Sequence, residues 1–430
     1  MLPFRKIFTK GKSVLILGFG KEGRSSYAFL RKYFPGCRVG IADRNKALAE
    51  ENLPVPMYLG RDYLQAVQEY DLIMKSPGVK LWGLPGHVQK KVTSQTDLFL
   101  RAYGKQTIGI TGTKGKSTTA SLIYHLLKNT GKSTLLMGNI GLPAFDFVEN
   151  LNGNELIVYE LSAHQLEIVH RSPHIAVLLN LFPEHLDYFG TFEKYKQAKM
   201  NIFRFQKPGD SIFCGEQAAG IFSRCKSVQD LKKIFHPGDL LLRSGLKGEH
   251  NLNNILLAFA VLQQIGVPLA KLPLALAGFA PLPHRLEYVG NYGGIDFYND
   301  SISTVPQSTM AAVKSIPQVN TIVLGGFDRG LDYTGLVDFL ENTDIKYLFL
   351  MGKAGEQMQH LFQLRNSRKN LISVKDLQEV FSYLKRFPDV SCCLLSPAAA
   401  SYDQFHNFEH RGDIFKKLAT DFGMEIKNGA

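Results

Sequence analysis

A glycine-rich segment between Gly109 and Thr118 carries the residue types that bind phosphate groups. It reads Gly-Ile-Thr-Gly-Thr-Lys-Gly-Lys-Ser-Thr, follows an apolar run and precedes an expected helix. Consecutive backbone N–H groups in such a loop cradle phosphates, while Lys116 reaches the terminal phosphate oxygens and Ser117 holds Mg²⁺. Ile110 stands where the strict GxxxxGK[ST] pattern has its first glycine, but the rest of the pattern is present. The segment therefore predicts an ATP-type phosphate loop.

A second glycine segment lies near the start of the chain. Residues Gly18 to Gly23 form a GxGxxG pattern after an apolar run, and Asp43 follows Gly23 by 20 residues. Glycines allow backbone N–H groups to approach a diphosphate at a helix N-terminus, and the acid can bind a ribose hydroxyl. Any nucleotide diphosphate, including that of a UDP-sugar, satisfies this geometry. A tight strand-to-helix turn without a ligand is the alternative interpretation.

Two phosphate sites in one chain narrow the range of functions. A dehydrogenase has no use for an ATP loop, whereas a ligase that activates a UDP-linked carboxylate with ATP uses both sites. An NAD-binding protein would explain the segment Gly18–Gly23 and Asp43, but it would leave Lys116 and Ser117 without a role. A non-catalytic nucleotide-binding protein is a weaker alternative.

Short apolar runs alternate with helical stretches, and this pattern restarts twice along the chain. Such alternation predicts an α/β protein whose parallel sheets are covered on both faces. We expect a Rossmann-like domain over residues 1–102, a central P-loop ATPase-like domain over 103–281 and a C-terminal Rossmann-like domain over 282–430. Pro281 and Pro283 mark the expected linker and hinge. The expected strands are 13–18, 38–42, 70–74, 107–111, 156–159, 175–179, 321–324, 347–350 and 392–395, and helices are expected at 23–33 and up to about residue 129.

Composition excludes several classes of protein. With 430 residues, 45% of them hydrophobic and 20% charged, the chain is an ordinary globular protein rather than a disordered or disulfide-stapled one. No apolar run approaches the roughly 18 residues of a membrane helix, and the start lacks a secretory signal pattern, so a cytoplasmic protein is expected. The net charge is +12, but scattered Lys and Arg favour a solvated surface or an anionic small substrate over nucleic acid. None of the five cysteines forms a CxxC pair, and Cys392 and Cys393 are expected to be buried thiols.

Further motifs resemble those of the Mur ligase superfamily, which includes the folylpolyglutamate synthases. Residues 160–167, Glu-Leu-Ser-Ala-His-Gln-Leu-Glu, are similar to ELSSFQLE of its glutamate-adding branch. The resemblance covers essentially the whole chain. The other matching segments are the ATP loop at 112–118, Gly-Asn-Ile-Gly at 138–141, Glu-His-Leu-Asp at 184–187, His-Asn-Leu-Asn-Asn at 250–254, His-Arg at 284–285, Asn-Asp-Ser at 299–301 and the segment 395–412.

The resemblance implies an ATP-dependent amide ligase. The implied reaction adds D-glutamate to UDP-N-acetylmuramoyl-L-alanine through an acyl phosphate, as a cytoplasmic step of peptidoglycan precursor synthesis. ATP is then a substrate, two Mg²⁺ ions are expected, and the protein is expected to be a monomer without nucleic-acid or membrane partners. A folylpolyglutamate-synthase-like ligase is an alternative. It should lack the glycine segment at 18–23 and the Ser-Pro-Ala-Ala-Ala-Ser sequence at 396–401, both present here.

The resemblance also assigns residues to each role. The implied catalytic residues are Lys116, Glu160, His185 and Lys199. The implied ATP-binding residues are Gly112, Thr113, Lys114, Gly115, Lys116, Ser117, Thr118, Asn251, Asn254, His284, Arg285 and Asp300. The implied UDP-sugar-binding residues are Gly18, Phe19, Gly20, Asp43, Arg44, Ser76, Pro77, Gly78 and Asn139. The implied glutamate-binding residues are Thr304, Arg329, Ser401 and Phe408. The implied metal ligands are Ser117, Glu160, His185 and a carbamylated Lys199.

Physical chemistry supports the metal ligands to different degrees. Acyl phosphate formation brings a carboxylate against the γ-phosphate, so cations must offset several negative charges. Glu160 and Ser117 carry oxygen ligands that suit Mg²⁺, whereas His185 is a softer ligand and alone is typical of a packed or surface histidine. Lys199 alone is typical of a solvated helix face. Its carbamate, which only the resemblance implies, would replace a repelled ammonium with an anionic ligand.

One departure from the superfamily concerns the amino-acid substrate. The segment NDSKATN is here Asn-Asp-Ser-Ile-Ser-Thr at 299–304, so that Ile302 replaces a lysine. A lysine of the later GGDGK turn is also replaced, in a segment that contains Arg329. Arg329 could clamp a glutamate carboxylate bidentately, and a surface turn arginine is the other interpretation. Because some relatives with an NDSIST segment are L-glutamate ligases, L-glutamate is the alternative to D-glutamate.

Overall fold

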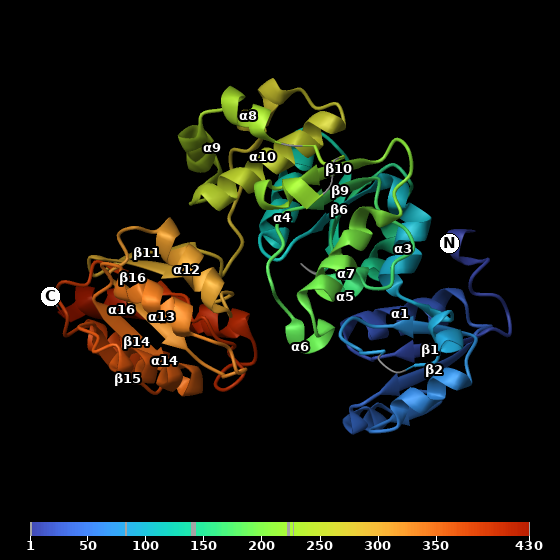
Figure 1. Ribbon diagram of the computed structural model, residues 1–430, viewed down its shortest axis with the longest axis horizontal. Helices are drawn as coiled ribbons and strands as arrows, with labels where there is room; N and C mark the ends of the chain where they lie inside the picture. The colour runs from blue at the N-terminus through green and yellow to red at the C-terminus, as the bar shows by residue number, and fades with distance from the viewer. Residues whose placement is uncertain (1, 82–83, 139–142, 222–223, 227, 430) are drawn as a thin grey trace. The chain divides into compact units, whose positions relative to one another are not determined.

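The computed structural model of the chain contains three β-sheets with helices packed against them (Figure 1). It describes residues 2–429 except 82–83, 139–142, 222–223 and 227. The chain divides into two compact units, one formed by residues 1–243 with 252–279 and the other by 244–251 with 280–430. The first unit holds two sheets and the second holds one. The expected α/β class is therefore confirmed, while the expected domain boundaries after residues 102 and 281 stay predictions.

The first sheet is parallel throughout, in the order β3-β2-β1-β4-β5. Its central strand β1 is a buried apolar run, as expected for a strand covered on both faces. The strand order reverses around β1, so the carboxyl ends of β1 and β4 border the crevice in which such sheets bind ligands. The elements are β1 (Ser13–Leu17), α1 (Lys21–Tyr33), β2 (Arg38–Asp43), β3 (Met57–Leu59), β4 (Leu72–Lys75), α2 (Gly86–Gln89), β5 (Val92–Thr93) and α3 (Gln95–Tyr103).

The second sheet is also parallel, in the order β10-β9-β6-β8-β7. The chain leaves β6, β8 and β9 at the same edge, so the loops after these three strands meet there. Ile202 and Phe203 of α7 share a core with Ile157 and Tyr159 of β8. The elements are β6 (Thr107–Thr111), α4 (Lys116–Asn129), β7 (Thr134–Gly138), β8 (Leu156–Glu160), α5 (Ala163–Leu166), β9 (Ile175–Leu178), α6 (Leu186–Phe189), α7 (Phe192–Arg204) and β10 (Ser211–Cys214).

The third sheet is mixed, in the order β11-β12-β16-β13-β14-β15, because β11 runs antiparallel to β12 at one edge. Gly293 and Gly294 form the tight turn of this hairpin with φ values of +60° and +83°, a conformation that favours glycine. Two separate apolar cores include alternate residues of the strands. The elements are β11 (Glu287–Tyr292), β12 (Ile295–Asn299), α12 (Pro306–Ser315), β13 (Thr321–Gly325), α13 (Thr334–Glu341), β14 (Tyr347–Met351), α14 (Gly352–Leu364), β15 (Asn370–Val374), α15 (Leu377–Leu384), β16 (Cys392–Leu395) and α16 (Phe408–Gly429).

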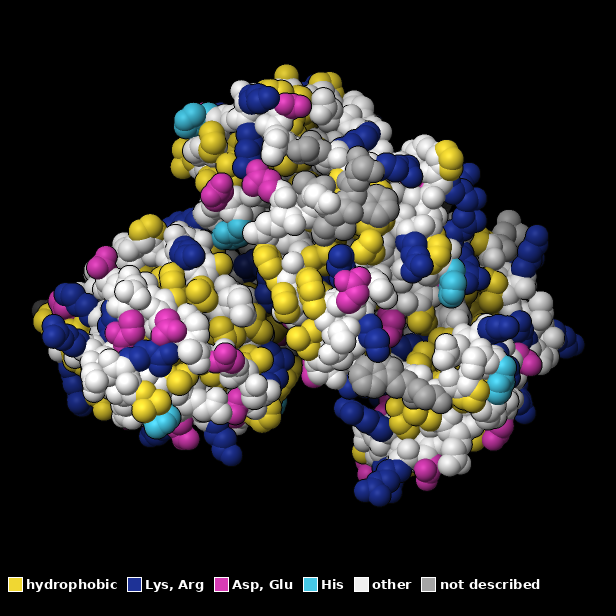
Figure 2. Space-filling model, in the orientation of Figure 1, with side chains coloured by type: hydrophobic (Ala, Val, Ile, Leu, Met, Phe, Trp, Pro, Cys, Tyr) yellow, Lys and Arg dark blue, Asp and Glu magenta, His cyan; other side chains and the backbone are white. Residues whose placement is uncertain are grey.

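Four further helices follow β10 in the sequence. None of the helices in the described part of the chain combines the length and the apolar character that crossing a membrane requires. In the face shown in Figure 2, Lys and Arg side chains are spread among acidic and apolar ones rather than gathered in one patch. The four helices are α8 (Gln229–Ile234), α9 (Pro237–Ser244), α10 (Glu249–Gln264) and α11 (Leu272–Ala275).

A polar seam joins the first and second sheets inside the first unit. Ser25 of α1 donates a 2.6 Å hydrogen bond to Asp146, which precedes β8. Lys75, the last residue of β4, forms a 2.9 Å ion pair with Glu167, which follows α5. The Lys75 side chain is 1% exposed, so this pair is largely shielded from solvent. Elements of the expected N-terminal and central domains are therefore in direct contact.

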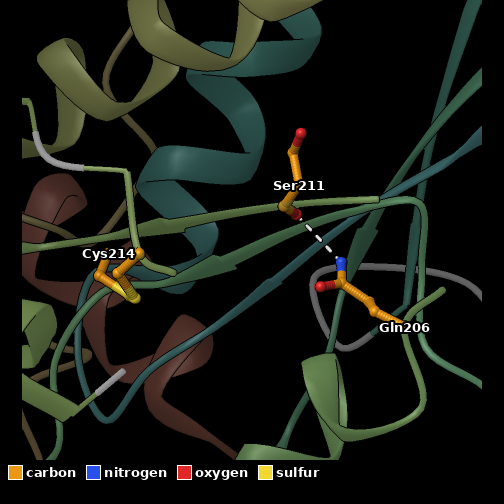
Figure 3. Close-up of a disulfide and its surroundings, with 4 residues drawn as sticks. Gln206, Ser211 and Cys214 are labelled. Carbon is orange, nitrogen blue, oxygen red and sulfur yellow. Dashed lines mark hydrogen bonds between the residues drawn. A yellow bond between two sulfur atoms is a disulfide. The ribbon is translucent and has the colours of Figure 1, made fainter. Parts of the chain in front are cut away.

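Cys214, at the end of β10, forms a disulfide with Cys225 in the loop that follows (Figure 3). At the other end of the strand, Gln206 donates a 3.0 Å hydrogen bond from Nε2 to the carbonyl oxygen of Ser211. The two cysteines are 11 residues apart, so the absence of CxxC pairs said nothing about them. The other three cysteines, Cys37, Cys392 and Cys393, are free and buried, which confirms the expectation for the adjacent pair.

Candidate active site

A cavity of about 580 Å³ opens at the carboxyl ends of β1, β2 and β4. Three segments that are separate in the sequence meet there, one after each of these strands. The expected residues that line it are Gly18, Gly20, Asp43, Arg44, Ser76, Pro77 and Gly78. The sequence analysis missed Lys21, Glu22, Tyr63, Val79 and Lys80, which also line it. The crevice predicted by the strand order is thus present, and it is lined by both acidic and basic side chains.

Hydrogen bonds hold the glycine loop in shape. Gly18 has φ of +92°, and its carbonyl oxygen accepts a 2.6 Å hydrogen bond from Ser76 Oγ. A Cβ atom at Gly23, the third residue of α1, would lie 2.2 Å from that same oxygen, so only glycine fits at this position. Asp43 Oδ2 accepts a 2.7 Å hydrogen bond from the N–H of Phe19. The loop is therefore fixed to both neighbouring strands.

Phe19, one of the expected UDP-sugar residues, is absent from the lining of this cavity. The ring of Phe19 is buried, with the Arg24 guanidinium 4.7 Å from its centroid. Asn139 lies outside the described residues. Phe19 is therefore tied to the glycine loop through its backbone N–H rather than its side chain. A sequence motif cannot distinguish these two roles.

The predicted phosphate loop connects β6 to α4. Gly115 precedes α4 with φ of +84°. Lys116 Nζ donates hydrogen bonds to the carbonyl oxygens of Gly112, at 3.1 Å, and Thr113, at 2.9 Å. The N–H of Lys114 donates to Asn180 Oδ1 at 2.8 Å. The loop therefore has the strand-loop-helix setting that its sequence predicted, with the Lys116 ammonium folded over it.

Glu160 and Lys199 are brought to this loop by different elements. Glu160 is buried at the end of β8, in register with Ile110 of β6. Lys199 of α7 is 1% exposed and donates a 2.7 Å hydrogen bond to the carbonyl oxygen of Gly112. Burial, reinforced by the charge of Lys116, lowers the pKa of Lys199 well below its ordinary value. Lys199 is consequently not on a solvated helix face, and its buried amine is favoured in the neutral form.

His185 and Glu184 lie in the loop between β9 and α6, at the same edge of the second sheet. His185 has φ of +56°, a left-handed conformation that is rare for residues other than glycine and that concentrates at functional sites. Burial lowers the pKa of His185, which favours the neutral imidazole that can bind a metal ion. Burial alone would raise the pKa of Glu184, but the Lys114 ammonium at 2.7 Å lowers it overall. An ionised carboxylate therefore stands beside the loop.

The side chains expected to bind metal come from one strand of the second sheet, β8, and from three segments that surround it: α4, the start of α6, and α7. The described residues contain no group of three or more His, Cys, Asp and Glu side chains that could hold a metal ion. Glu160 and His185 would therefore need the hydroxyl of Ser117 and a modified Lys199 to complete a ligand set. Their donor atoms fit Mg²⁺ through the oxygens of Glu160 and Ser117, with His185 as the softer member.

Around the phosphate loop lie two residues that the sequence analysis did not assign to the site, Tyr195 and Asn180, and one that it did, Asn254. Tyr195 of α7 places its hydroxyl 3.0 Å from Thr113 Oγ1. Asn180 follows β9 directly, so its position at a strand end was the available signal. A Cβ atom at Gly115 would lie 3.1 Å from Asn254 Oδ1, which places this expected ATP-binding asparagine against the loop. Asn251, in the second unit, donates a 2.8 Å hydrogen bond to the carbonyl oxygen of Lys247.

A second group of expected residues lies at the carboxyl end of β12, in the second unit. Asp300 accepts hydrogen bonds from Ser396 Oγ, at 2.8 Å, and from the N–H of Leu286, at 3.2 Å. Burial raises the pKa of Asp300 to about 6, although hydrogen bonds from Ser303 and Ser396 and the charge of Arg285 act to lower it. His284 is buried with φ of +61°, and its Nδ1 lies 2.9 Å from Asn299 Nδ2. The expected linker and β12 residues thus form one hydrogen-bonded group.

Arg411 anchors the loop that carries Ser401. This fully buried guanidinium donates to the carbonyl oxygens of Ala399, at 3.1 Å, and Ser301, at 2.8 Å. Ser401 itself is 2% exposed, and Phe408 accepts a 2.8 Å hydrogen bond from Ser301 Oγ at its carbonyl oxygen. The loops after β12 and β16 are therefore tied together. The sequence analysis did not single out Arg411.

Arg329 and Thr304 meet at the same edge of the third sheet. Arg329 follows β13 and donates a 3.1 Å hydrogen bond from Nη2 to the carbonyl oxygen of Thr304. Arg329 is exposed, and Thr304 is half-buried. The guanidinium therefore keeps donors for a further acceptor, which suits a carboxylate.

Comparison with known proteins bears on these sites. Residues 110–219 match the model of the Mur ligase middle domain. A UDP-N-acetylmuramoylalanine–D-glutamate ligase of Koribacter versatilis is 34% identical, with 97% of this chain and 99% of that protein covered. One of Clostridium kluyveri is 31% identical, with 97% of this chain and 98% of that protein covered. The chain belongs to the UDP-N-acetylmuramoylalanine–D-glutamate ligase family.

Membership of this ligase family confirms the resemblance to the Mur ligase superfamily and identifies the chain as an ATP-dependent ligase. Solved structures add the fold. A MurF structure from Acinetobacter baumannii is 17% identical with a TM-score of 0.60, and 96% of this chain and 91% of that chain are covered. A UDP-N-acetylmuramate–alanine ligase of Thermotoga maritima is 18% identical with a TM-score of 0.57, and 95% of this chain and 99% of that chain are covered. At this identity the likeness concerns the fold alone.

Proposed function

We propose that this chain joins D-glutamate to UDP-N-acetylmuramoyl-L-alanine at the expense of ATP, as a step of peptidoglycan precursor synthesis. The observation that carries the proposal is that one compact unit holds two glycine-rich loops of the kind that binds phosphate, each after a central strand of its own parallel sheet. The first borders the cavity at Gly18, and the second carries Lys116 beside Glu160 and Lys199. A ligase that activates a nucleotide-linked carboxylate needs both loops.

The reaction has two steps that balance in charge and atoms. A carboxylate oxygen of the L-alanine attacks the γ-phosphorus of ATP, and ADP leaves with the electron pair of the broken P–O bond. The glutamate amine then attacks the acyl carbon of the phosphorylated carboxylate. The tetrahedral intermediate collapses with release of inorganic phosphate, and the amine loses a proton to a base that we do not assign. Lys116 would offset the charge that gathers on the phosphate oxygens.

We assign the metal-binding role to Ser117, Glu160 and His185. Mg²⁺ held by these residues would supply positive charge where two anions, the carboxylate and the γ-phosphate, must approach each other. The oxygen donors of Glu160 and Ser117 support this choice of ion, and two ions are expected from the resemblance. Glu160 is held by β8, so its carboxylate is on a rigid element.

We further propose that Lys199 carries a carbamate. A neutral lysine amine attacks CO₂, forms a C–N bond and releases one proton, which leaves an anionic N-carboxylate. The burial of Lys199 and its lowered pKa support this chemistry, because they favour the neutral amine. The product would be a carboxylate next to the phosphate loop, where an ammonium would repel a metal ion.

Residues that follow strands of the third sheet would bind the amino acid. Arg329 and Thr304 are close enough to share a hydrogen bond, and Ser401 lies on the loop that Arg411 holds. We assign the binding of glutamate to Arg329, Thr304, Ser401 and Phe408, and the binding of ATP to His284, Arg285 and Asp300. The monomeric state remains an expectation from the resemblance. ATP and a UDP-linked substrate support action in the cytoplasm.

Phosphate release from ATP with UDP-N-acetylmuramoyl-L-alanine tests the proposal. Release with D-glutamate and its absence with L-glutamate is the expected result, and the Lys116→Ala variant should release phosphate about 10²–10³-fold more slowly. Release with L-glutamate alone would make Ile302 and Arg329 specificity determinants and refute the D-glutamate assignment. Release with neither amino acid would refute the proposed reaction.

A further inference from the structure

Glu22 lies beneath the glycine loop of the first cavity in an arrangement that a diphosphate-binding loop does not require. It is the second residue of α1 and lines the cavity. Its Oε1 accepts a 2.6 Å hydrogen bond from Gln165 Nε2, which belongs to α5 of the second sheet. Its Oε2 is buried and receives no hydrogen bond from any described residue. A carboxylate is thus placed, out of solvent, where a bound diphosphate would bring further negative charge.

The position of the Glu22 carboxyl group is fixed by Gln165. The amide oxygen of Gln165 accepts hydrogen bonds from Ser162, from N at 2.9 Å and from Oγ at 3.1 Å. Ser162 in turn caps α5 through the N–H of Gln165 at 3.2 Å. The amide therefore cannot turn over without losing the cap, and its NH₂ group must point to Glu22. Glu22 cannot move its charge away from the loop without breaking this contact.

Gln95, a second buried amide, also contacts α1, and its Nε2 lies 3.5 Å from the Glu22 carbonyl oxygen. Gln95 of α3 donates from Nε2 to Ser25 and Ser26, at 3.1 and 3.2 Å. The other end of that amide, Oε1, is buried and receives no hydrogen bond from the described residues, as with Glu22 Oε2. Buried acceptor oxygens such as these two are costly to leave unpaired. A proton on Glu22 would convert one of them into a donor.

Few charges compensate an ionised Glu22. The charge of Lys75 acts on Glu22, but Lys75 already pairs with Glu167 at 2.9 Å. Burial raises the pKa of Glu22 to about 7, against the opposing effects of Gln165 and Lys75. Burial also raises the pKa of Tyr159 and lowers that of His164 to about 4, so neither titrates near neutral pH. The charged and titratable groups on the surrounding elements include Lys21 and Arg24 of α1, Asp43 of β2, Lys75 of β4, Asp97 and Arg101 of α3, Tyr159 and Glu160 of β8, His164 of α5, Glu167, and Asp146, which accepts a hydrogen bond from Ser25.

We propose that Glu22 is a proton-linked binding residue, which takes up a proton when the nucleotide diphosphate of the substrate enters the cavity. This inference rests on the proposed function, since it uses the UDP-linked substrate. In the unliganded protein near pH 7, Glu22 exchanges between carboxylate and carboxylic acid. The bound diphosphate disfavours the carboxylate across a poorly hydrated region, so one proton from the buffer adds to Glu22 as the ligand binds. The loop therefore binds its anionic ligand more tightly at lower pH.

Isothermal titration calorimetry with UDP-N-acetylmuramoyl-L-alanine measures this uptake directly. The carboxyl group of this ligand titrates well below neutral pH, and the diphosphate is fully ionised. Titrations between about pH 6.5 and pH 8.5, in buffers of different ionisation enthalpy, yield the number of protons bound. We expect uptake that approaches one proton above pH 7, and an affinity that falls by up to about tenfold per pH unit.

Two variants separate Glu22 from other groups. Glu22→Gln keeps an acceptor for Gln165 without a charge, so its affinity should not depend on pH and it should take up no proton. Glu51→Gln is the matched control, because Glu51 pairs with Arg24 of the same helix and does not line the cavity. Its proton uptake should equal that of the unmodified chain.

The possible results have distinct meanings. Binding of the ligand without proton uptake, at an affinity that is constant over this pH range, would overturn the role of Glu22 and leave the proposed function standing. Proton uptake that persists in Glu22→Gln would assign the proton to another group, and this result would also overturn the role of Glu22. Failure of the unmodified chain to bind this ligand at any pH, with ATP binding intact, would overturn the proposed function and this inference together. The measurement on the unmodified chain decides the matter even if Glu22→Gln does not fold.

Discussion

The amine of Lys199 lies 2.7 Å from the carbonyl oxygen of Gly112, so a helix residue reaches the backbone of the phosphate loop from beneath. The two residues are 87 positions apart in the chain. The contact exists because α7 packs against the second sheet with Ile202 and Phe203 in the core. It places a lysine of lowered pKa beside the loop that we assign to ATP.

Replacement of Lys199 tests the carbamate. We expect Lys199→Ala to lower kcat by about 10²–10³-fold, because the loop loses an anionic group that helps to hold positive charge at the reacting phosphate. Protein incubated with ¹³C-bicarbonate should show a carbamate signal by NMR that is missing from Lys199→Ala. Lys196→Ala, on the same helix, is the control and should keep both signal and activity. A full-strength carbamate signal in Lys199→Ala would place the modification elsewhere.

Lys116 should be indispensable for phosphoryl transfer. Its ammonium folds over the carbonyl oxygens of Gly112 and Thr113 and is placed to follow the phosphate as charge develops. We expect Lys116→Ala to lower the rate of ADP formation by about 10²–10³-fold. Lys132→Ala, an exposed lysine just after the same helix, should retain the full rate. ADP formation at the normal rate in Lys116→Ala would show that this loop does not bind the transferred phosphate.

The sequence predicted the sheets where strands are buried on both faces. The apolar runs at β1, β6, β8 and β16 placed the strand ends, and with them Gly18, Glu160 and Ser401, to within two residues. It missed β3, β5, β7, β10 and β15, which are short or lack a long apolar run, and the hairpin of β11 and β12, where β11 is half-exposed. An edge strand of this kind is defined by its partner rather than by its own composition.

Other features depend on contacts between distant residues. Glu22 belongs to a recognisable glycine motif, but the burial of its carboxyl group comes from Gln165, which is 143 residues away. Arg411 is long and charged, a type that is usually exposed, and only the arrangement of surrounding carbonyl groups explains its burial. The burial of Lys199 is of the same kind. Motif spacing identified the loops, whereas the electrostatic environment required the folded chain.

Arg329 should determine the affinity for glutamate. Its guanidinium donates to Thr304 and retains donors for a carboxylate, and a charge-assisted hydrogen bond contributes about 1.5–3 kcal/mol. We therefore expect Arg329→Ala to raise the KM for D-glutamate by about 10–100-fold. The KM for ATP should stay the same, and Arg329→Lys should show an intermediate effect because a lysine lacks the bidentate geometry. Equal increases in both KM values would instead indicate disruption of the domain.

Arg411 should determine the stability of the second unit. It donates to carbonyl oxygens of Ser301, Ala399 and Ala400 in a region without solvent access. Arg411→Ala leaves these acceptors unpaired, so we expect a loss of about 3–5 kcal/mol in the free energy of unfolding. Lys417→Ala, an exposed position on the same helix, should change it by less than about 0.5 kcal/mol. Urea unfolding followed by circular dichroism compares the two, and equal midpoints would exclude an anchoring role for Arg411.

Glu22 should make the stability of the first unit depend on pH. Its pKa is about 7 in the folded chain against an ordinary value of 4.5, so the folded state binds more protons than the unfolded state between these values. Stability from this group is therefore complete below about pH 4.5 and is lost as pH rises toward 7. At about 1.36 kcal/mol per pH unit, the loss amounts to roughly 3 kcal/mol. Glu22→Gln lacks this ionisation, so its free energy of unfolding, measured against that of the unmodified chain, should improve by roughly that amount from pH 5 to pH 8. A constant difference between the two proteins over this range would mean that Glu22 is ionised at neutral pH in the folded chain as it is in the unfolded one.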